Sequence, residues 1–272
     1  MAGTEPKRIS IGALVRFAYR SVFGRVMTIL DIGWMPLIPL LAALILPGIF
    51  APARSDPDTL SFGPLSYVEA VVVMLSLAAF AVRWHQAILV GDPRRLPRAA
   101  FLGAWWRFLA YMIVIYIVIA LVLVAALAVL SQVKLDEATT ALLELVAILL
   151  SLAVSLAVLR FGLLFPAAAA GKPLGPLEAW RLMRGNTWRL AVASFLTAFP
   201  VMFVTGFITL LVLTIALPKD DLTAPPPFGL VIIAGLIEAA ADLVLVALGA
   251  SLLSACYREI AMRRDVNGAS GA

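Results

Sequence analysis

The chain has 272 residues and a net charge of +5; 63% of its residues are hydrophobic and only 14% are charged. Soluble domains usually contain about 45–50% apolar and about 25% charged residues, so this composition excludes an ordinary water-soluble protein. The positive charge does not indicate a nucleic-acid partner, because no basic run is interleaved with aromatic residues. Basic loops at an anionic membrane surface explain it instead.

Six apolar runs are each long enough to cross a bilayer as a helix, which takes about 20 residues. A strand within lipid leaves its backbone groups unsatisfied unless it belongs to a closed barrel, and barrel strands are short and alternating. The sequence therefore predicts an all-α fold, a polytopic membrane bundle with six transmembrane helices. The runs cover approximately residues 28–50, 65–90, 108–131, 141–168, 190–217 and 228–256.

The distribution of basic residues predicts the orientation of this bundle. Of the 21 Lys and Arg residues, only Arg54, Lys134 and Lys219 lie in the loops that follow the first, third and fifth runs. Cytoplasmic loops are enriched in Lys and Arg, so both termini are expected in the cytoplasm. We expect a single membrane domain over residues 1–272: a cytoplasmic arm (1–27), the six-span bundle (28–256) and a cytoplasmic tail (257–272).

The arm before the first run is amphipathic. Residues 9–26 interleave aliphatic and aromatic side chains with Arg16, Arg20 and Arg25. Such a helix suits the inner headgroup layer, with its apolar face toward the acyl chains and its guanidinium groups on lipid phosphates. The alternative is that the segment only extends the first span into water, and the sequence does not decide between the two.

The second run ends in Arg83-Trp84-His85-Gln86. His85 is the only histidine of the chain, and a lone histidine at the membrane interface is more often a hydrogen-bonded structural residue than a catalytic one. Cys256 is the only cysteine, which excludes an intrachain disulfide and a cysteine-rich metal site. We therefore expect no metal and no cofactor.

The fourth run carries a polar stripe and ends in Arg160. Glu144, Ser151, Ser155 and Gly162 follow one another at intervals of seven, four and seven residues, so they share one face of a helix. Polar and small residues on transmembrane helices favour helix–helix contacts. We expect this face to pack against the sixth span.

A second amphipathic arm, residues 174–189, precedes the fifth run. Its basic residues Arg181, Arg184 and Arg189, together with Trp188, predict lipid-headgroup contacts like those of the first arm. As for the first arm, the alternative is an extension of the following span.

The two arms are related by a faint internal repeat. Three residues recur at a constant offset of 164: Arg20, Arg25 and Pro36 correspond to Arg184, Arg189 and Pro200. The second, fourth and sixth runs also end in an Arg beside an aromatic residue, at Arg83-Trp84, Arg160-Phe161 and Tyr257-Arg258. One interpretation is three related helical hairpins. The sequence favours the other, the general enrichment of Arg and aromatic residues at the inner membrane interface.

The sixth run contains two carboxylates, Glu238 and Asp242, which lie one helical turn apart. At about 1.5 Å per residue they lie roughly 15 Å and 21 Å from Phe228, where the run begins. Ionisable residues at such depth are rare and are functional or paired. Gly235 and Gly249 extend the same face, so we expect it to pack closely on another helix.

Two interpretations of this carboxylate pair remain open. The first is a site for a proton, a cation or a ligand headgroup. The second is an ion-pair network in which Arg83 or Arg160 neutralises Glu238 and Asp242, because two like charges at this depth require a cation or a proton. The sequence slightly favours the second, structural interpretation.

Two motifs carry a resemblance to a known family. The segment 179–190, AWRLMRGNTWRL, and the segment 83–91, RWHQAILVG, resemble patterns in YciC-like bacterial inner-membrane proteins and in the related membrane domain of some glycerophosphodiester phosphodiesterases. The resemblance implies a multi-pass protein of the bacterial inner membrane without an assigned reaction. The chain contains no phosphodiesterase domain, so that activity is not implied.

Three functions are compatible with these features. The favoured one is a protein that binds anionic membrane lipids or a membrane partner and supports envelope organisation. The second is a small transporter or exporter that uses Glu238 and Asp242. The third is an intramembrane enzyme acting on a lipid headgroup through His85, Arg83, Arg160 and Asn186. The sequence disfavours an enzyme, because it contains no HExxH helix, P-loop, GxSxG or dinucleotide motif. A homo-oligomer or a membrane-protein partner is left open.

Overall fold

The computed structural model describes residues 8–50, 64–92, 97–130, 137–216 and 227–262. Six helices of this part of the chain are long and apolar enough to cross a membrane: Val26–Leu46, Ser66–Leu89, Arg98–Ala126, Leu145–Ala169, Thr187–Val212 and Phe228–Ala261. They coincide with the six apolar runs, and the described residues contain no β-strand. The predicted all-α, six-span fold class is confirmed.

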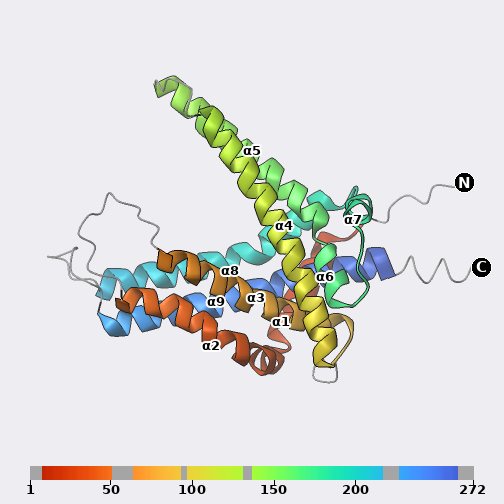
Figure 1. The fold of residues 1–272 in the computed structure, drawn as a ribbon, viewed down its shortest axis with the longest axis horizontal. Coiled ribbons are helices and arrows are strands. Elements are labelled where there is room, and N and C mark those ends of the chain that lie inside the picture. Colours follow the sequence, from red (N-terminus) through yellow and green to blue (C-terminus); the bar gives the residue numbers. More distant parts are fainter. Residues whose placement is uncertain (1–7, 51–63, 93–96, 131–136, 217–226, 263–272) are drawn as a thin grey trace, which may run out of the picture.

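The helices form three successive hairpins (Figure 1). The first comprises α1 (Ile11–Phe23), α2 (Val26–Phe50) and α3 (Pro64–Leu89). The second comprises α4 (Arg98–Leu130), α5 (Glu137–Phe161) and the short α6 (Leu164–Ala169). The third comprises α7 (Pro176–Leu182), α8 (Thr187–Ala216) and α9 (Phe228–Tyr257), which ends in the π-helical turn η2 (Arg258–Met262).

Four of these helices, α2, α3, α8 and α9, form the packed bundle. Helix α9 is central to it and contacts the other three. Glycines let the backbones approach: a Cβ atom added at Gly235 of α9 would lie 2.7 Å from Cγ1 of Ile45 on α2. At Gly33 of α2 the same atom would lie 3.4 Å from the ring of Phe80 on α3. Small residues thus set the helix spacing, as in other membrane bundles.

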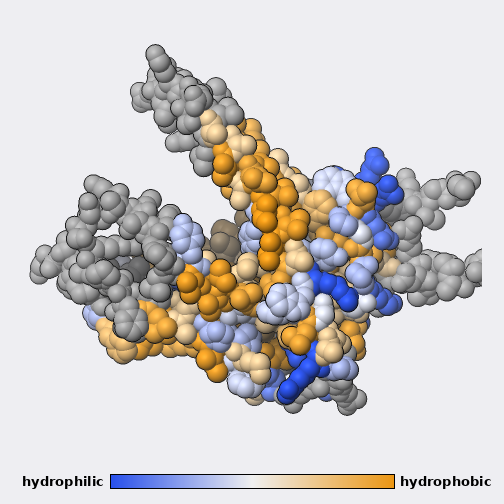
Figure 2. Space-filling view, in the orientation of Figure 1, coloured by the Kyte–Doolittle hydropathy of each residue, from blue (hydrophilic) through white to orange (hydrophobic). Residues whose placement is uncertain are grey.

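The hairpin of α4 and α5 diverges from the packed bundle (Figure 1). Helix α4 contacts α3 and α6, and α5 contacts α7 and α8, but α4 and α5 make few contacts with each other. Apolar side chains cover the diverging part and are exposed, among them Ile117, Leu121, Val124, Ile148 and Leu152. Figure 2 shows this continuous apolar surface, which suits the hydrocarbon of a bilayer.

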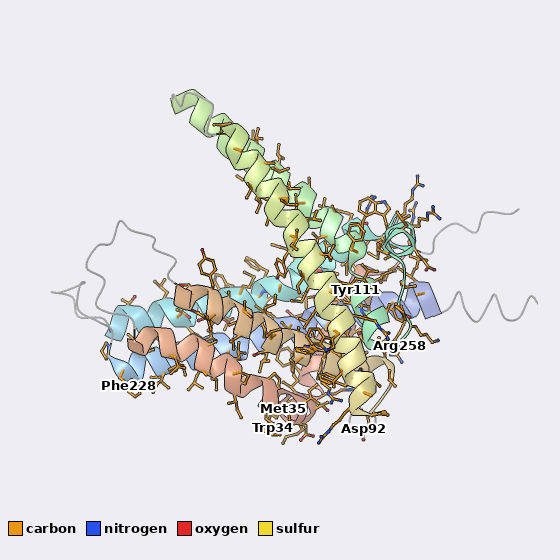
Figure 3. The ribbon with its side chains drawn as sticks, viewed as in Figure 1. Trp34, Met35, Asp92, Tyr111, Phe228 and Arg258 are labelled. Atoms are coloured by element: carbon orange, nitrogen blue, oxygen red, sulfur yellow. The ribbon has the colours of Figure 1, made fainter. Side chains whose placement is uncertain are left out.

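One end of the molecule, the basic end, carries α1, α6, α7 and the last turn of α9. Figure 2 shows hydrophilic residues gathered there, and both ends of the described chain lie there in Figure 1. Figure 3 places Arg258 at this end and Phe228 at the opposite end of α9. Both ends of the described chain and the hydrophilic residues gathered there thus share one end of the six apolar helices.

The first arm folds as a helix of its own. Helix α1 ends at Phe23, and a turn at Gly24 and Arg25 separates it from α2. Helix α1 packs on α8 and α9 rather than continuing the first span into water. Its buried residues are Leu14, Ala18, Ser21 and Val22, and its exposed basic residues are Arg16 and Arg20. The amphipathic pattern is thus used to dock the arm on the bundle.

Two element boundaries differ from the predicted runs. Helix α4 begins at Arg98 rather than near residue 108, because Pro97 starts the helix and no proline interrupts it afterwards. The second arm forms only the short helix α7, which ends at Leu182. A turn at Gly185, whose φ is +83°, separates it from α8. Glycine adopts this left-handed conformation without a steric cost.

Candidate functional site at the basic end

The turn before α8 holds the first arm in place. Asn186 is buried, and its Oδ1 accepts a hydrogen bond of 3.0 Å from the backbone N–H of Ile9. Nη1 of Arg189 donates a hydrogen bond of 2.9 Å to the carbonyl oxygen of the same residue. Both backbone groups of Ile9 are therefore held by the segment that follows Gly185. Arg189 is half-buried in this contact, whereas a headgroup ligand was expected.

A second contact joins the arm to α8 farther along. The hydroxyl of Tyr19 donates a hydrogen bond of 3.0 Å to the carbonyl oxygen of Thr197. Thr197 is buried, and its own hydroxyl donates to the carbonyl oxygen of Ala193 one turn earlier. The arm is thus fixed to α8 at two separate positions along the helix.

The motif at the end of α3 joins this helix to α9. Nε1 of Trp84 donates a hydrogen bond of 2.9 Å to Oγ of Ser251, and Nδ1 of His85 lies 2.8 Å from Oγ of Ser254. All four residues are buried. Ser251 and Ser254 lie three residues apart and therefore on the same face of α9. Two consecutive residues of α3 thus reach one face of α9. This geometry suits the structural role that the sequence favours for His85.

The next residue of the motif, Gln86, reaches α6. Its Nε2 donates a hydrogen bond of 3.3 Å to the carbonyl oxygen of Ala169. Its Oε1, like Nε1 of Trp105 on α4, has no hydrogen-bond partner within the described part of the chain. A buried acceptor and a buried donor therefore lie among α3, α4 and α6.

Arg83 and Arg160 both lie against aromatic rings at the basic end. Cζ of Arg83 is 4.0 Å from the centroid of the Phe101 ring at the start of α4. Cζ of Arg160 is 4.4 Å from the centroid of the Trp180 ring in α7. Such cation–π contacts are attractive because the ring face is negative. The structure thus brings these two guanidinium groups to rings in the following hairpin and not to the carboxylates of α9.

The carboxylate pair lies on the outside of the bundle. Glu238 is exposed and Asp242 is half-buried. On the face that they share, a Cβ atom at Gly235 would meet Ile45 of α2, whereas one at Gly249 would meet nothing within 4 Å. The close approach that both glycines predict is therefore found at Gly235 and not at Gly249.

The polar stripe of the fourth span also lies away from α9. Ser151 and Ser155 are exposed, because α5 diverges with α4 from the bundle. Only the end of the stripe reaches α9: a Cβ atom at Gly162 would lie 2.8 Å from Cδ2 of Leu253. The prediction that the stripe packs on the sixth span is wrong except at this glycine. The side chain of Glu144 lies outside the described part of the structure.

The remaining predicted headgroup ligands are at the surface of the basic end. Arg16, Arg20, Arg25, Arg181 and Arg184 are exposed. The side chain of Trp188 is 65% exposed. These residues belong to α1, to the turn after it and to the segment from α7 to the start of α8, the elements that lie at the basic end.

Two cavities open at the basic end. The larger, of about 570 Å³, lies between the start of α1 and the end of α9 and is lined by Arg8, Ile9, Ser10, Ala13, Leu14, Phe17, Ala255, Arg258 and Glu259. The smaller, of about 440 Å³, is lined by Arg25, Thr28, Asp31, Ile32, Ala87, Gly91 and Asp92. Neither is lined by Glu238 or Asp242.

The sequence did not single out Arg8, Asp31 and Asp92 as functional candidates. Arg258 could have been found, because it stands beside an aromatic residue near the end of its apolar run, as Arg83 and Arg160 do in theirs. Nothing in the sequence indicates that Arg8 joins it in a cavity, since this depends on how α1 docks.

The fold defines this chain as a multi-pass α-helical integral membrane protein with a polar, basic end. Comparison of the chain with protein-family models, with curated proteins and with solved structures finds no match. The resemblance to the YciC-like family stays a prediction.

Proposed function

We propose that this integral membrane protein binds anionic lipids at its basic end and thereby supports the organisation of the bacterial inner membrane, with the basic end in the cytoplasm. The observation that carries this proposal is the set of exposed arginines around an otherwise apolar bundle: Arg16, Arg20, Arg25, Arg181 and Arg184. Guanidinium groups match the geometry of phosphate oxygens and remain charged at all relevant pH values.

The position of these arginines relative to the apolar surface supports the same conclusion. Exposed Trp188 and Leu177 lie in the same arm as Arg181 and Arg184. Trp favours the boundary between headgroups and acyl chains, where arginine side chains reach lipid phosphates. Each basic residue at an anionic surface contributes about 1 kcal/mol, so several together produce a marked lipid preference.

A transporter is the second candidate, and one observation favours it. Glu238 is exposed although it lies roughly 15 Å along α9 from Phe228, where an unpaired carboxylate is costly in lipid. A proton, a cation or a partner helix would relieve that cost. Lipid binding remains the better-supported function, because several exposed arginines carry it, whereas the cavities of about 570 Å³ and 440 Å³ are not lined by this carboxylate.

An enzyme acting on a lipid headgroup receives less support. The residues considered for it, His85, Arg83, Arg160 and Asn186, do not converge on one point. His85 is bonded to Ser254 in the interior, Asn186 holds Ile9, and the two arginines stack on separate rings.

The proposed function is tested by measuring which lipids the purified protein retains. Native mass spectrometry of the protein in detergent with equal amounts of phosphatidylglycerol and phosphatidylcholine should show a preference for phosphatidylglycerol. A variant with Arg16, Arg20, Arg181 and Arg184 changed to Gln should lose most of that preference. Arg189 is left unchanged, because its loss would free the first arm.

The matched control removes charge from the opposite side of the predicted bundle. Arg54→Gln with Lys134→Gln and Lys219→Gln should retain the preference for phosphatidylglycerol. A four-arginine variant that binds phosphatidylglycerol as the wild type does would refute the proposed function.

A further inference from the structure

The three hairpins meet one another at the basic end in a cyclic order. Arg83, in the last two turns of α3, stacks on Phe101 at the start of the second hairpin. Arg160 at the end of α5 stacks on Trp180 at the start of the third. The corresponding Arg258 directly follows α9, and the helix that packs beside α9 is α1, the start of the first hairpin.

The junction between the third and first hairpins, where α9 meets α1, differs from the other two contacts between hairpins. Arg258 and the aromatic residue Phe17 of α1 line one cavity of about 570 Å³. Cation–π contacts occupy the first two junctions, whereas among the described residues no ring lies over Arg258. Space is thus left at this junction beside an exposed guanidinium group.

The lining of this cavity is amphiphilic. Arg8 and Arg258 are exposed basic residues at its rim, and Glu259 is the single acidic residue. These three side chains sum to one positive charge, which matches the single negative charge of a phosphodiester. Ile9, Leu14, Phe17 and Ala255 form an apolar wall, and the volume lies within the range of about 300–1,000 Å³ that is usual for ligand sites.

We infer that this cavity binds one anionic phospholipid of the phosphatidylglycerol type. Its phosphate lies between Arg8 and Arg258, and the first part of an acyl chain lies along Phe17 and Leu14. The N-terminus of α1 also favours an anion at this position. Ser10 caps the helix without a side-chain hydrogen bond, and no acidic residue occurs in the first turn. The inference rests on the proposed function, since it requires the basic end to face anionic lipid.

The smaller cavity does not share this chemistry. Asp31 and Asp92 line it together with Arg25, so its ionisable residues sum to one negative charge. An anionic headgroup is therefore expected at the junction of α1 and α9 only.

The inference is tested on the full-length protein in detergent by native mass spectrometry with phosphatidylglycerol. The wild type should retain one phosphatidylglycerol per chain more strongly than all others. Arg8→Gln with Arg258→Gln should reduce the affinity of this first lipid about ten-fold or more, because two charge contacts of about 1 kcal/mol each are lost.

A second variant changes the shape of the cavity and leaves its charge unaltered. Ala13 lines the cavity and is exposed, so Ala13→Trp should fill the space without disturbing the packing of α1. It should also expel the first lipid, with an unchanged melting temperature. Arg181→Gln with Arg184→Gln is the control, which should lose weaker lipids and keep the first.

The outcomes separate the inference from the proposed function. If the lipid preference depends on the arm arginines and both cavity variants keep the first lipid, the cavity site is refuted and the proposed function stands. If the wild type shows no preference for phosphatidylglycerol, both are refuted. If glycerol 3-phosphate or inorganic phosphate displaces the first lipid at equal concentration, the cavity binds a soluble phosphate and the inference is overturned.

Discussion

Helix α9, at the centre of the packed bundle, and helix α4 of the diverging hairpin are both strongly apolar but differ in how far they are buried. In the most apolar 18-residue window of α9, 28% of the residues are buried, and the mean hydropathy is 2.4. The corresponding window of α4 has a higher mean hydropathy, 3.0, and only 11% of it is buried. Hydrophobicity thus predicts which helices enter the membrane but not which helices pack together, because lipid solvates apolar surface as well as a neighbouring helix does.

Small and polar residues explain the difference between α9 and α4. Helix α9 contacts α2 at Gly235 and α3 through Ser251 and Ser254. Residues 108–130 of α4 contain no Gly, Ser or Thr. The part of α4 that does pack lies at the basic end, where Ala104, Phe108 and Leu109 are buried.

The largest effect is expected from a tryptophan that belongs to the packed bundle. Trp84→Ala removes a fully buried side chain and its bond to Ser251, and should lower the free energy of unfolding in mixed micelles by about 3–5 kcal/mol. Trp106 on α4 is 64% exposed and is the matched control, for which Trp106→Ala should cost less than about 1 kcal/mol. Equal losses would contradict the distinction between bundle and hairpin.

A smaller effect is expected where α9 approaches α2. Gly235→Ala places a methyl group 2.7 Å from Ile45 and should destabilise the bundle by about 1–3 kcal/mol. Gly249→Ala on the same helix face meets nothing within 4 Å and should leave the unfolding free energy unchanged or raise it. The two variants are compared by unfolding in mixed micelles, and a tolerated Gly235→Ala would show that the two helices are not in close contact.

The first arm should loosen when its hydrogen bonds are removed. Asn186→Ala leaves the N–H of Ile9 without its acceptor and should cost about 1–3 kcal/mol locally. Hydrogen exchange measured by mass spectrometry should then accelerate in α1 and remain unchanged in α3. Protection of α1 that equals that of the wild type would mean that Asn186 does not hold the arm.

The smallest effect is expected on the diverging part of the hairpin. Leu121 is 64% exposed, so Leu121→Ala exchanges one lipid-facing apolar side chain for another and should change the unfolding free energy by about 0.5 kcal/mol or less. A loss comparable to that of Trp84→Ala would show that α4 packs against a partner at this position.

The spans were predictable, because each is a local property of about 20 residues. The contacts of the basic end were not. Asn186 and Ile9 lie 177 residues apart, so no local pattern indicates that one holds the other. Sequence separation likewise hides the partners of Arg83 and Arg160. These two residues were considered as partners of the α9 carboxylates, whereas the aromatic rings that they contact lie in the next hairpin.

The polar stripe shows how a periodic pattern can mislead. Ser151 and Ser155 share a helix face, which predicts a contact but does not identify the neighbour. In the structure α5 diverges with α4, and both serines are exposed.

Lipid selectivity at the protein surface is the most direct test of the central claim, that the basic end binds anionic lipid. Electron paramagnetic resonance of spin-labelled lipids in reconstituted bilayers measures the fraction that the protein immobilises. A larger immobilised fraction for phosphatidylglycerol than for phosphatidylcholine is expected, and it should shrink in high salt as the charges are screened. Equal fractions for the two lipids at low salt would contradict the claim.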